Sequence, residues 1–214
     1  MTFHGLPDRT TTVSPVIGAL AACLLLSGCG TVGANDQGAG PSIDEAAAPK
    51  LPPGVLPPND PPQPGDAKLG PDGHYDYSAP DFVLKNPCDM DIYQRALEKG
   101  WKAPDFGTKR RDEESLATCG LINDGGAALI INNTLNRRKI EELGYPITDH
   151  GVEQTSWYTF VSKGDLFDEC TATADTSEGS LGVSLAIGGF SEMKTSEETC
   201  EYVSARYTEL IRGE

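Results

Sequence analysis

Hydrophobic residues recur at helical spacing in residues 89–99, which read DMDIYQRALEK. Ile92, Ala96 and Leu97 fall on one face of such a helix, as expected for a helix that covers a core. Three residues suit its N-cap, its first turn and its exit: Asn86, Pro87 and Gly100. The pattern therefore predicts an amphipathic helix that ends at Gly100.

A second helical stripe lies close to residue 214. Thr195 and Glu198 have the spacing of a capping box. Apolar residues then follow at helical spacing: Cys200, Val203, Tyr207, Leu210 and Ile211. A shorter helix is predicted over residues 137–144, RRKIEELG, with Gly144 at its end.

Five segments between these helices have the composition and alternation of strands. They are residues 116–122, 127–133, 155–161, 169–175 and 180–189. Turn sequences separate most of them, the clearest being Asn-Asp-Gly-Gly at 123–126. This order predicts an α+β domain with an antiparallel sheet of about five strands, flanked by N- and C-terminal helices.

A different apolar run, Val16–Leu26, is too short to span a membrane, because at about 1.5 Å per residue it covers roughly half of the ~30 Å hydrocarbon layer. It leads into Leu26-Ser27-Gly28-Cys29, which resembles the bacterial lipobox. Residues 1–28 are therefore expected to be a lipoprotein signal peptide. Lipid on Cys29 would anchor the chain to the cell membrane, facing the extracytoplasmic side. The alternative is an ordinary thiol after a conventional signal peptide.

Residues 29–76 are expected to form a disordered tether that starts at the lipidated Cys29. Ten of the sixteen prolines lie between Pro41 and Pro71, and the segment has no aromatic residue before Tyr75. Such a segment offers little apolar surface to bury and few backbone donors. We therefore expect the globular domain to comprise residues 77–214, a suitable length for a single core.

The formal net charge is −15 at pH 7, and removal of residues 1–28 leaves it unchanged because Asp8 and Arg9 cancel. A chain this acidic repels nucleic acid and anionic lipid headgroups, so neither is an expected partner. Plain solubility is the simplest interpretation of the charge, and a dedicated cationic partner is the alternative. The domain is expected to be a monomer.

Four cysteines fall in the predicted domain, and an even number in an exported domain favours two disulfides with three possible pairings. We predict the sequential pairing, Cys88–Cys119 and Cys170–Cys200. Each bridge would close a loop of about thirty residues and stabilise the fold by roughly 3–4 kcal/mol. No CxxC motif occurs and no histidine lies beside these cysteines, so neither a metal site nor a cofactor is expected.

The motif Asn86-Pro87-Cys88, together with Cys119, Cys170 and Cys200, the lipobox and the Pro-rich segment, resembles an actinobacterial lipoprotein family called domain of unknown function 3558. This family more often has Asp at the position of Asn86, and a Trp often follows its second cysteine, where this chain has Gly120. The resemblance implies a PsbP-like α/β sandwich with an extracytoplasmic binding or sensing role. It implies no catalytic residues.

Candidate chemistry in the predicted domain is sparse. His74 and His150 are the histidines beyond the signal segment, and both fall in expected loop or tether. No GxSxG or HExxH motif occurs. Acidic clusters lack the spacing of an EF-hand: Asp89 and Asp91; Asp165, Asp168 and Glu169; Glu197, Glu198 and Glu201. Four aromatic residues fit either a ligand pocket or the core: Trp101, Trp157, Tyr145 and Tyr158.

The sequence thus predicts a lipid-anchored envelope lipoprotein whose domain binds or senses an unidentified ligand or protein without catalysis. Two alternatives stay open: a small cell-wall hydrolase, and a structural accessory subunit of an envelope protein complex.

Overall fold

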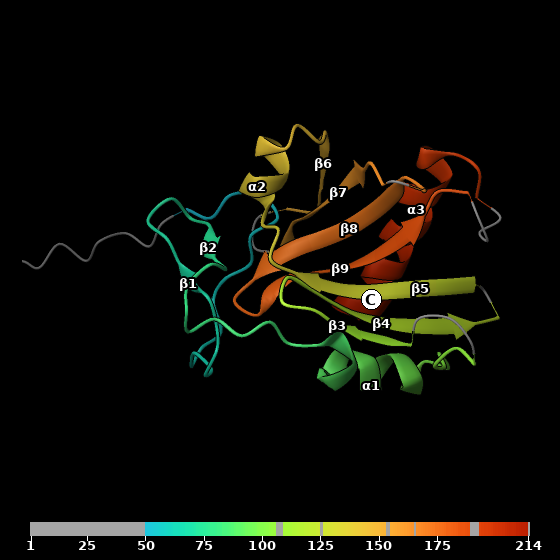
Figure 1. Cartoon of the computed structure of the whole chain (residues 1–214), viewed down its shortest axis with the longest axis horizontal. Coiled ribbons are helices and arrows are strands. Elements are labelled where there is room, and N and C mark those ends of the chain that lie inside the picture. Colours follow the sequence, from blue (N-terminus) through green and yellow to red (C-terminus); the bar gives the residue numbers. More distant parts are fainter. Residues whose placement is uncertain are drawn as a thin grey trace, which may run out of the picture. The chain divides into compact units, whose positions relative to one another are not determined.

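A seven-stranded antiparallel sheet forms the centre of the fold, with strand order β3-β4-β5-β9-β8-β7-β6 (Figure 1). Its strands are β3 (Arg110–Asp112), β4 (Leu116–Asn123), β5 (Gly126–Asn133), β6 (Ile147–His150), β7 (Trp157–Ser162), β8 (Glu169–Thr176) and β9 (Gly179–Ala186). The expected α+β class with a mainly antiparallel sheet is therefore confirmed.

This computed structural model describes residues 50–105, 109–124, 126–152, 155–164, 166–188 and 193–213, all within the compact unit Ala46–Glu214. The expected signal peptide, Cys29 and the tether up to residue 49 lie outside the described residues. Among the described residues, no helix has the length and apolar character needed to cross a membrane.

The sheet has seven strands rather than about five because β3 and β6 carry no strand-like pattern. The β3 sequence Arg-Arg-Asp is exposed throughout, and β6 reads Ile-Thr-Asp-His. Both are short edge strands that form by pairing with β4 and β7, rather than by their own composition. The predicted hairpin is confirmed, since Asn123 pairs with Gly126 at the β4–β5 turn.

The first predicted helix is interrupted. A 3₁₀ turn, η1 (Pro87–Asp89), precedes α1 (Asp91–Glu98), and Met90 between them is extended, with ψ of 156°. Ile92 and Ala96 are buried, as expected, but Leu97 is 36 % exposed, so its assignment to the buried face was wrong. The break at Met90 turns the helix relative to its expected start at Asn86.

The remaining helices follow the predicted pattern closely. They are α2 (Arg137–Glu142), α3 (Ser196–Tyr207) and a π-helical turn, η3 (Thr208–Arg212). Both hydrogen bonds of the Thr195–Glu198 capping box form at the start of α3. Val203, Tyr207 and Leu210 are buried, which confirms the central part of the predicted stripe.

Helices α1 and α3 cover the same face of the sheet. Their apolar residues form one core with alternate residues of the strands, including Cys119, Ile130, Ala172, Val183 and Trp157. Helix α2 packs on the opposite face, where Ile140 contacts Tyr158 and Phe160 of β7. The sheet is thus covered by helices on both faces.

Residues 50–76 belong to the folded domain, which corrects the boundary expected at residue 77. They include two short strands, β1 (Lys68–Leu69) and β2 (Tyr75–Asp76), that pair with each other. Val55 and Tyr75 are 0 % and 1 % exposed and form a second small core with Ala67 and Tyr77. The apolar residues are too scattered to show a period, but Val55, Ala67 and Tyr75 are buried and Leu51 and Leu69 are partly buried in the folded segment.

Backbone hydrogen bonds attach this segment to the end of β8. Val55 forms a parallel bridge with Asp175. The Asp175 N–H donates to the Gly54 carbonyl at 2.8 Å, and Leu56 N–H donates to the Asp175 carbonyl at 2.9 Å. Gly54 has φ of +76°, and a Cβ there would lie 2.3 Å from Cδ1 of Tyr158. Only glycine allows this approach.

We expect Gly54→Ala to destabilise the protein strongly, by about 3 kcal/mol or more, because it combines backbone strain with a clash against a buried ring. Gly144→Ala is the matched control, since Gly144 also has a positive φ, +79°, but open space around its Cα. The control should cost about 1 kcal/mol. Urea unfolding of both variants measures this; equal losses would mean that residues 50–56 do not pack on Tyr158.

Candidate functional site

The two histidines beyond the signal segment lie at different places. His74 lies in the turn between β1 and β2, whereas His150 lies at the end of β6 rather than in the expected loop. They line separate clefts. The structure therefore does not bring them into one site.

The four candidate aromatic residues serve mainly the core. Trp101, Trp157 and Tyr158 are 1 %, 7 % and 0 % exposed. Tyr145 is partly buried against Phe160. The Trp101 indole donates to the Glu209 carboxylate at 2.9 Å, which fixes the turn η3 against the loop after α1. Of the two open interpretations, the packing favours core residues over a pocket lining.

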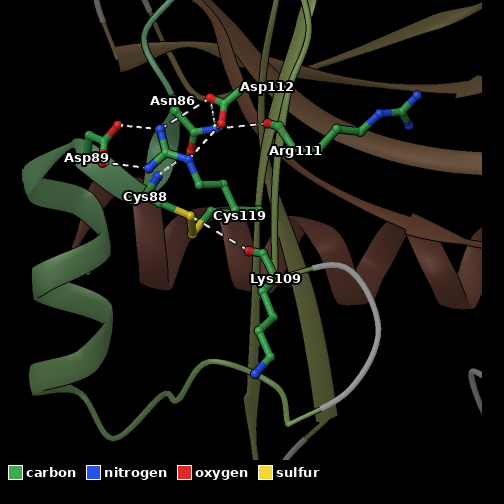
Figure 2. The surroundings of a disulfide bond; sticks show 8 residues. Asn86, Cys88, Asp89, Lys109, Arg111, Asp112 and Cys119 are labelled. Carbon is green, nitrogen blue, oxygen red and sulfur yellow. Dashed lines mark hydrogen bonds and ion pairs between the residues drawn. A yellow bond between two sulfur atoms is a disulfide. The ribbon is translucent and has the colours of Figure 1, made fainter.

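The Asn86-Pro87-Cys88 motif connects η1 to the sheet through hydrogen bonds (Figure 2). The Asn86 Oδ1 accepts from the Cys88 N–H at 2.9 Å, while its Nδ2 donates to the Arg111 carbonyl at 2.8 Å and to Asp112 Oδ1 at 2.6 Å. Asn86 is only 6 % exposed. Its contacts align Cys88 with Cys119, so the role of the motif is structural.

The two disulfides are Cys88–Cys119 and Cys170–Cys200, the pairing expected from the sequence. The first joins η1 to β4 and the second joins β8 to α3. Each therefore ties a helical element to the sheet.

Three acidic residues of the candidate clusters have clear structural partners: Asp89, Asp168 and Glu198. Arg110 contacts both carboxylate oxygens of Asp89 at 2.7 Å, and this hydrogen bonding lowers the pKa of Asp89 (Figure 2). Asp168 pairs with Lys163, and Glu198 caps α3. Asp165 lies outside the described residues. Among the described residues, no group of three or more His, Cys, Asp or Glu side chains is placed to hold a metal ion.

Glu197 and Glu201 differ from the acidic residues that have partners, because they face an open groove between α3 and β6. This groove has a volume of about 660 Å³ and is called here the β6–α3 groove. Residues that line it include Thr148, His150, Thr159, Val161, Glu197 and Glu201. Both glutamates are exposed, and neither forms an ion pair within the described part of the chain. The groove therefore presents uncompensated negative charge above a floor of strand residues.

His150 is held flat on the floor of this groove. Its ring stacks on Trp157 with centroids 4.2 Å apart, and its Nε2 lies 3.0 Å from the Thr159 hydroxyl oxygen. Burial lowers the pKa of His150, so the imidazole is neutral at pH 7. No carboxylate among the described residues hydrogen-bonds to this ring. His150 and Thr159 together offer a hydrogen-bond donor and an acceptor for a ligand, but they lack the orienting third group of a catalytic triad.

A second cleft, of about 650 Å³, lies between the β1–β2 hairpin and α2. Its charges are largely paired within the protein: Arg138 contacts Asp72 at 2.6 Å and Glu142 at 3.3 Å, and Lys139 contacts Glu142 at 3.1 Å. A ligand would have to displace these pairs. This makes it the weaker candidate of the two.

Asp175 is the one strongly perturbed carboxyl group in the described residues, and the sequence pattern did not single it out. It is fully buried, where Tyr158 Oη and the Arg137 N–H donate to its two carboxylate oxygens at 2.9 Å and 2.8 Å. Burial raises the pKa of Asp175 to about 6, against the opposing effect of these hydrogen bonds and of the Arg137 charge. It is 0 % exposed, so its role is in the fold.

We expect Asn86→Ala to cost about 2–3 kcal/mol of stability, because it removes a cap and leaves partner groups without their hydrogen bonds. Arg110→Ala is the control, since its ion pairs are exposed and such pairs contribute less than about 1 kcal/mol. Equal losses of stability for the two substitutions in urea unfolding would contradict the structural role of Asn86.

The stability difference between the wild type and Asp175→Asn should depend on pH. Because the pKa of Asp175 is raised in the folded state, the folded protein binds more protons than the unfolded chain between about pH 4 and pH 6. The wild type should therefore gain stability relative to the variant as the pH falls through this window, by about 3 kcal/mol at most. Urea unfolding from pH 4.5 to 7.5 measures it; a gain with rising pH would contradict it.

Comparison with known proteins adds no relative: no family model, no curated protein and no solved structure matches the chain. The likeness to the lipoprotein family described from the sequence therefore rests on the residue pattern alone.

Proposed function

We propose that the chain is a lipid-anchored lipoprotein of the bacterial cell envelope, attached to the membrane through Cys29 and facing the extracytoplasmic side. The observation that carries this proposal is the pair of disulfides, since such bonds persist in oxidising compartments outside the cytoplasm. The lipobox at Leu26–Cys29 supplies the anchor in this proposal.

The domain in this proposal binds or senses a ligand or a partner protein and catalyses no reaction. The β6–α3 groove supports binding, because it combines open volume, hydroxyl groups, a neutral imidazole and unpaired carboxylates. The proposed domain is a monomer with a PsbP-like sandwich fold, and the net charge of −15 argues against a nucleic-acid partner.

A role as accessory subunit of an envelope complex is the second candidate. Leu166 and Phe167, adjacent residues in the loop between β7 and β8, are 86 % and 45 % exposed. Adjacent exposed apolar side chains favour contact with a protein partner.

Cys29→Ser should abolish membrane retention, because the thioether cannot form without the thiol. We expect the variant to remain uncleaved, to incorporate no labelled fatty acid and to leave the membrane fraction of a bacterial host. Cys23→Ser is the control, since Cys23 lies within the signal segment and should not matter. Fatty-acid labelling of Cys29→Ser at the wild-type level would refute the anchor.

A further inference from the structure

The sheet has β3 at one edge and β6 at the other (Figure 1), and the two edges differ in their contacts. At one edge, Asn86 donates a hydrogen bond to the Arg111 carbonyl of β3, and the exposed Arg110 is bound to Asp89 and Asp112. At the other edge, β6 pairs with β7 alone among the strands of the described residues. An edge strand presents half of its backbone N–H and C=O groups away from the sheet, where a further strand can pair.

The β6–α3 groove runs beside this open edge. Helix α3 packs on β7, β8 and β9, and the space between the helix and β6 forms the groove. Thr148 and His150 of β6 point into it, together with Thr159 and Val161 of β7. A strand added next to β6 would lie about 4.8 Å further out and turn every second side chain toward the groove.

The negative charge of the groove indicates which kind of partner it can bind. Glu197 and Glu201 are one helical turn apart on the wall of the groove, whereas other acidic residues of α3 and η3 are engaged: Glu198 in the capping box and Glu209 with Arg206. The other ionisable group that faces the groove, His150, is neutral at pH 7 because burial lowers its pKa, and Cys200 is in a disulfide. The nearby Lys163 is bound to Asp168.

We propose that the β6–α3 groove binds a cationic peptide segment in extended conformation, which adds to the sheet beside β6 and places alternate Lys or Arg side chains at Glu197 and Glu201. Backbone pairing gives such a complex its affinity, and the alternate side chains give it specificity. A second copy of this chain is a poor occupant, because each copy has a net charge of −15. This inference rests on the proposed binding function and names the class of partner.

The test uses residues 29–214 with Cys29→Ser, which contain the whole compact unit Ala46–Glu214. The probes are fluorescein-labelled octapeptides KVKTKVKT and EVETEVET, measured by fluorescence anisotropy at low salt. We expect the lysine peptide to bind at least about tenfold more tightly than the glutamate peptide, which corresponds to about 1.4 kcal/mol. KPKTKPKT, with the same charge but with prolines that prevent strand pairing, should bind much more weakly than KVKTKVKT.

The variant Glu197→Gln/Glu201→Gln should reduce the preference for the lysine peptide to below about threefold. Glu98→Gln/Glu114→Gln is the matched control, because it removes the same charge from two exposed glutamates outside the groove. Amide shift changes on peptide addition should be largest at residues 147–150 and 197–204.

The proposal is overturned if neither peptide binds at about 1 mM, which is the weakest affinity of interest. It is also overturned if both glutamine variants bind the lysine peptide with the same affinity. A third contradicting result would be amide shift changes centred on the cleft beside Arg138. Dimerisation through β6 without peptide would show that a second copy is the occupant and would also overturn it. Each of these results leaves the Cys29→Ser test of membrane anchoring unaffected, so the two failures are distinguishable.

Discussion

Buried Asp175 joins three parts of the fold: the sheet, the start of α2 and residues 50–56. Its side chain accepts from Tyr158 Oη in the sheet and from the Arg137 N–H at the start of α2, while its backbone pairs with Gly54 and Leu56. The Arg137 guanidinium lies over the Tyr158 ring, 5.4 Å from its centroid, and also contacts Asp149. Burial of a charge is costly unless it is hydrogen-bonded, so these partners must stay in place together. The position of residues 50–56 and of α2 depends on this arrangement.

Sequence patterns predicted those elements that carry their own signal. The capping box at Thr195, the hairpin turn before Gly126 and the alternation in β7 and β8 all correspond to formed structure. The elements that were missed obtain their order from tertiary contacts. β3 and β6 have no alternation, and Val55 and Tyr75 are too far apart in sequence to indicate a core. The proline content of residues 50–76 indicated a disordered tether, which was wrong because prolines occur in ordered turns as well as in tethers.

The candidate site shows the same division. His150, Glu197 and Glu201 were recognised from the sequence as possible functional groups, but nothing in their spacing brings them together. Their common groove exists because β6 pairs with β7 and because the disulfide at Cys200 sets the start of α3 beside β8. Asp175 was not recognised at all, since a single Asp at the end of a strand usually suggests a turn residue. Its burial depends on residues more than a hundred positions earlier in the chain.

The two disulfide loops follow each other along the chain without overlapping, as Cys88–Cys119 closes before Cys170–Cys200 begins. A chain that enters an oxidising compartment N-terminus first therefore exposes Cys88 and Cys119 before Cys170 arrives. When Cys119 and later Cys200 emerge, the nearest preceding cysteine along the chain is in each case the native partner, so oxidation in order of emergence produces the native connectivity. Crossed pairings would require Cys88 and Cys119 to remain free thiols until Cys170 and Cys200 appeared. Correct oxidation of this protein is thus compatible with vectorial synthesis and does not require disulfide isomerisation.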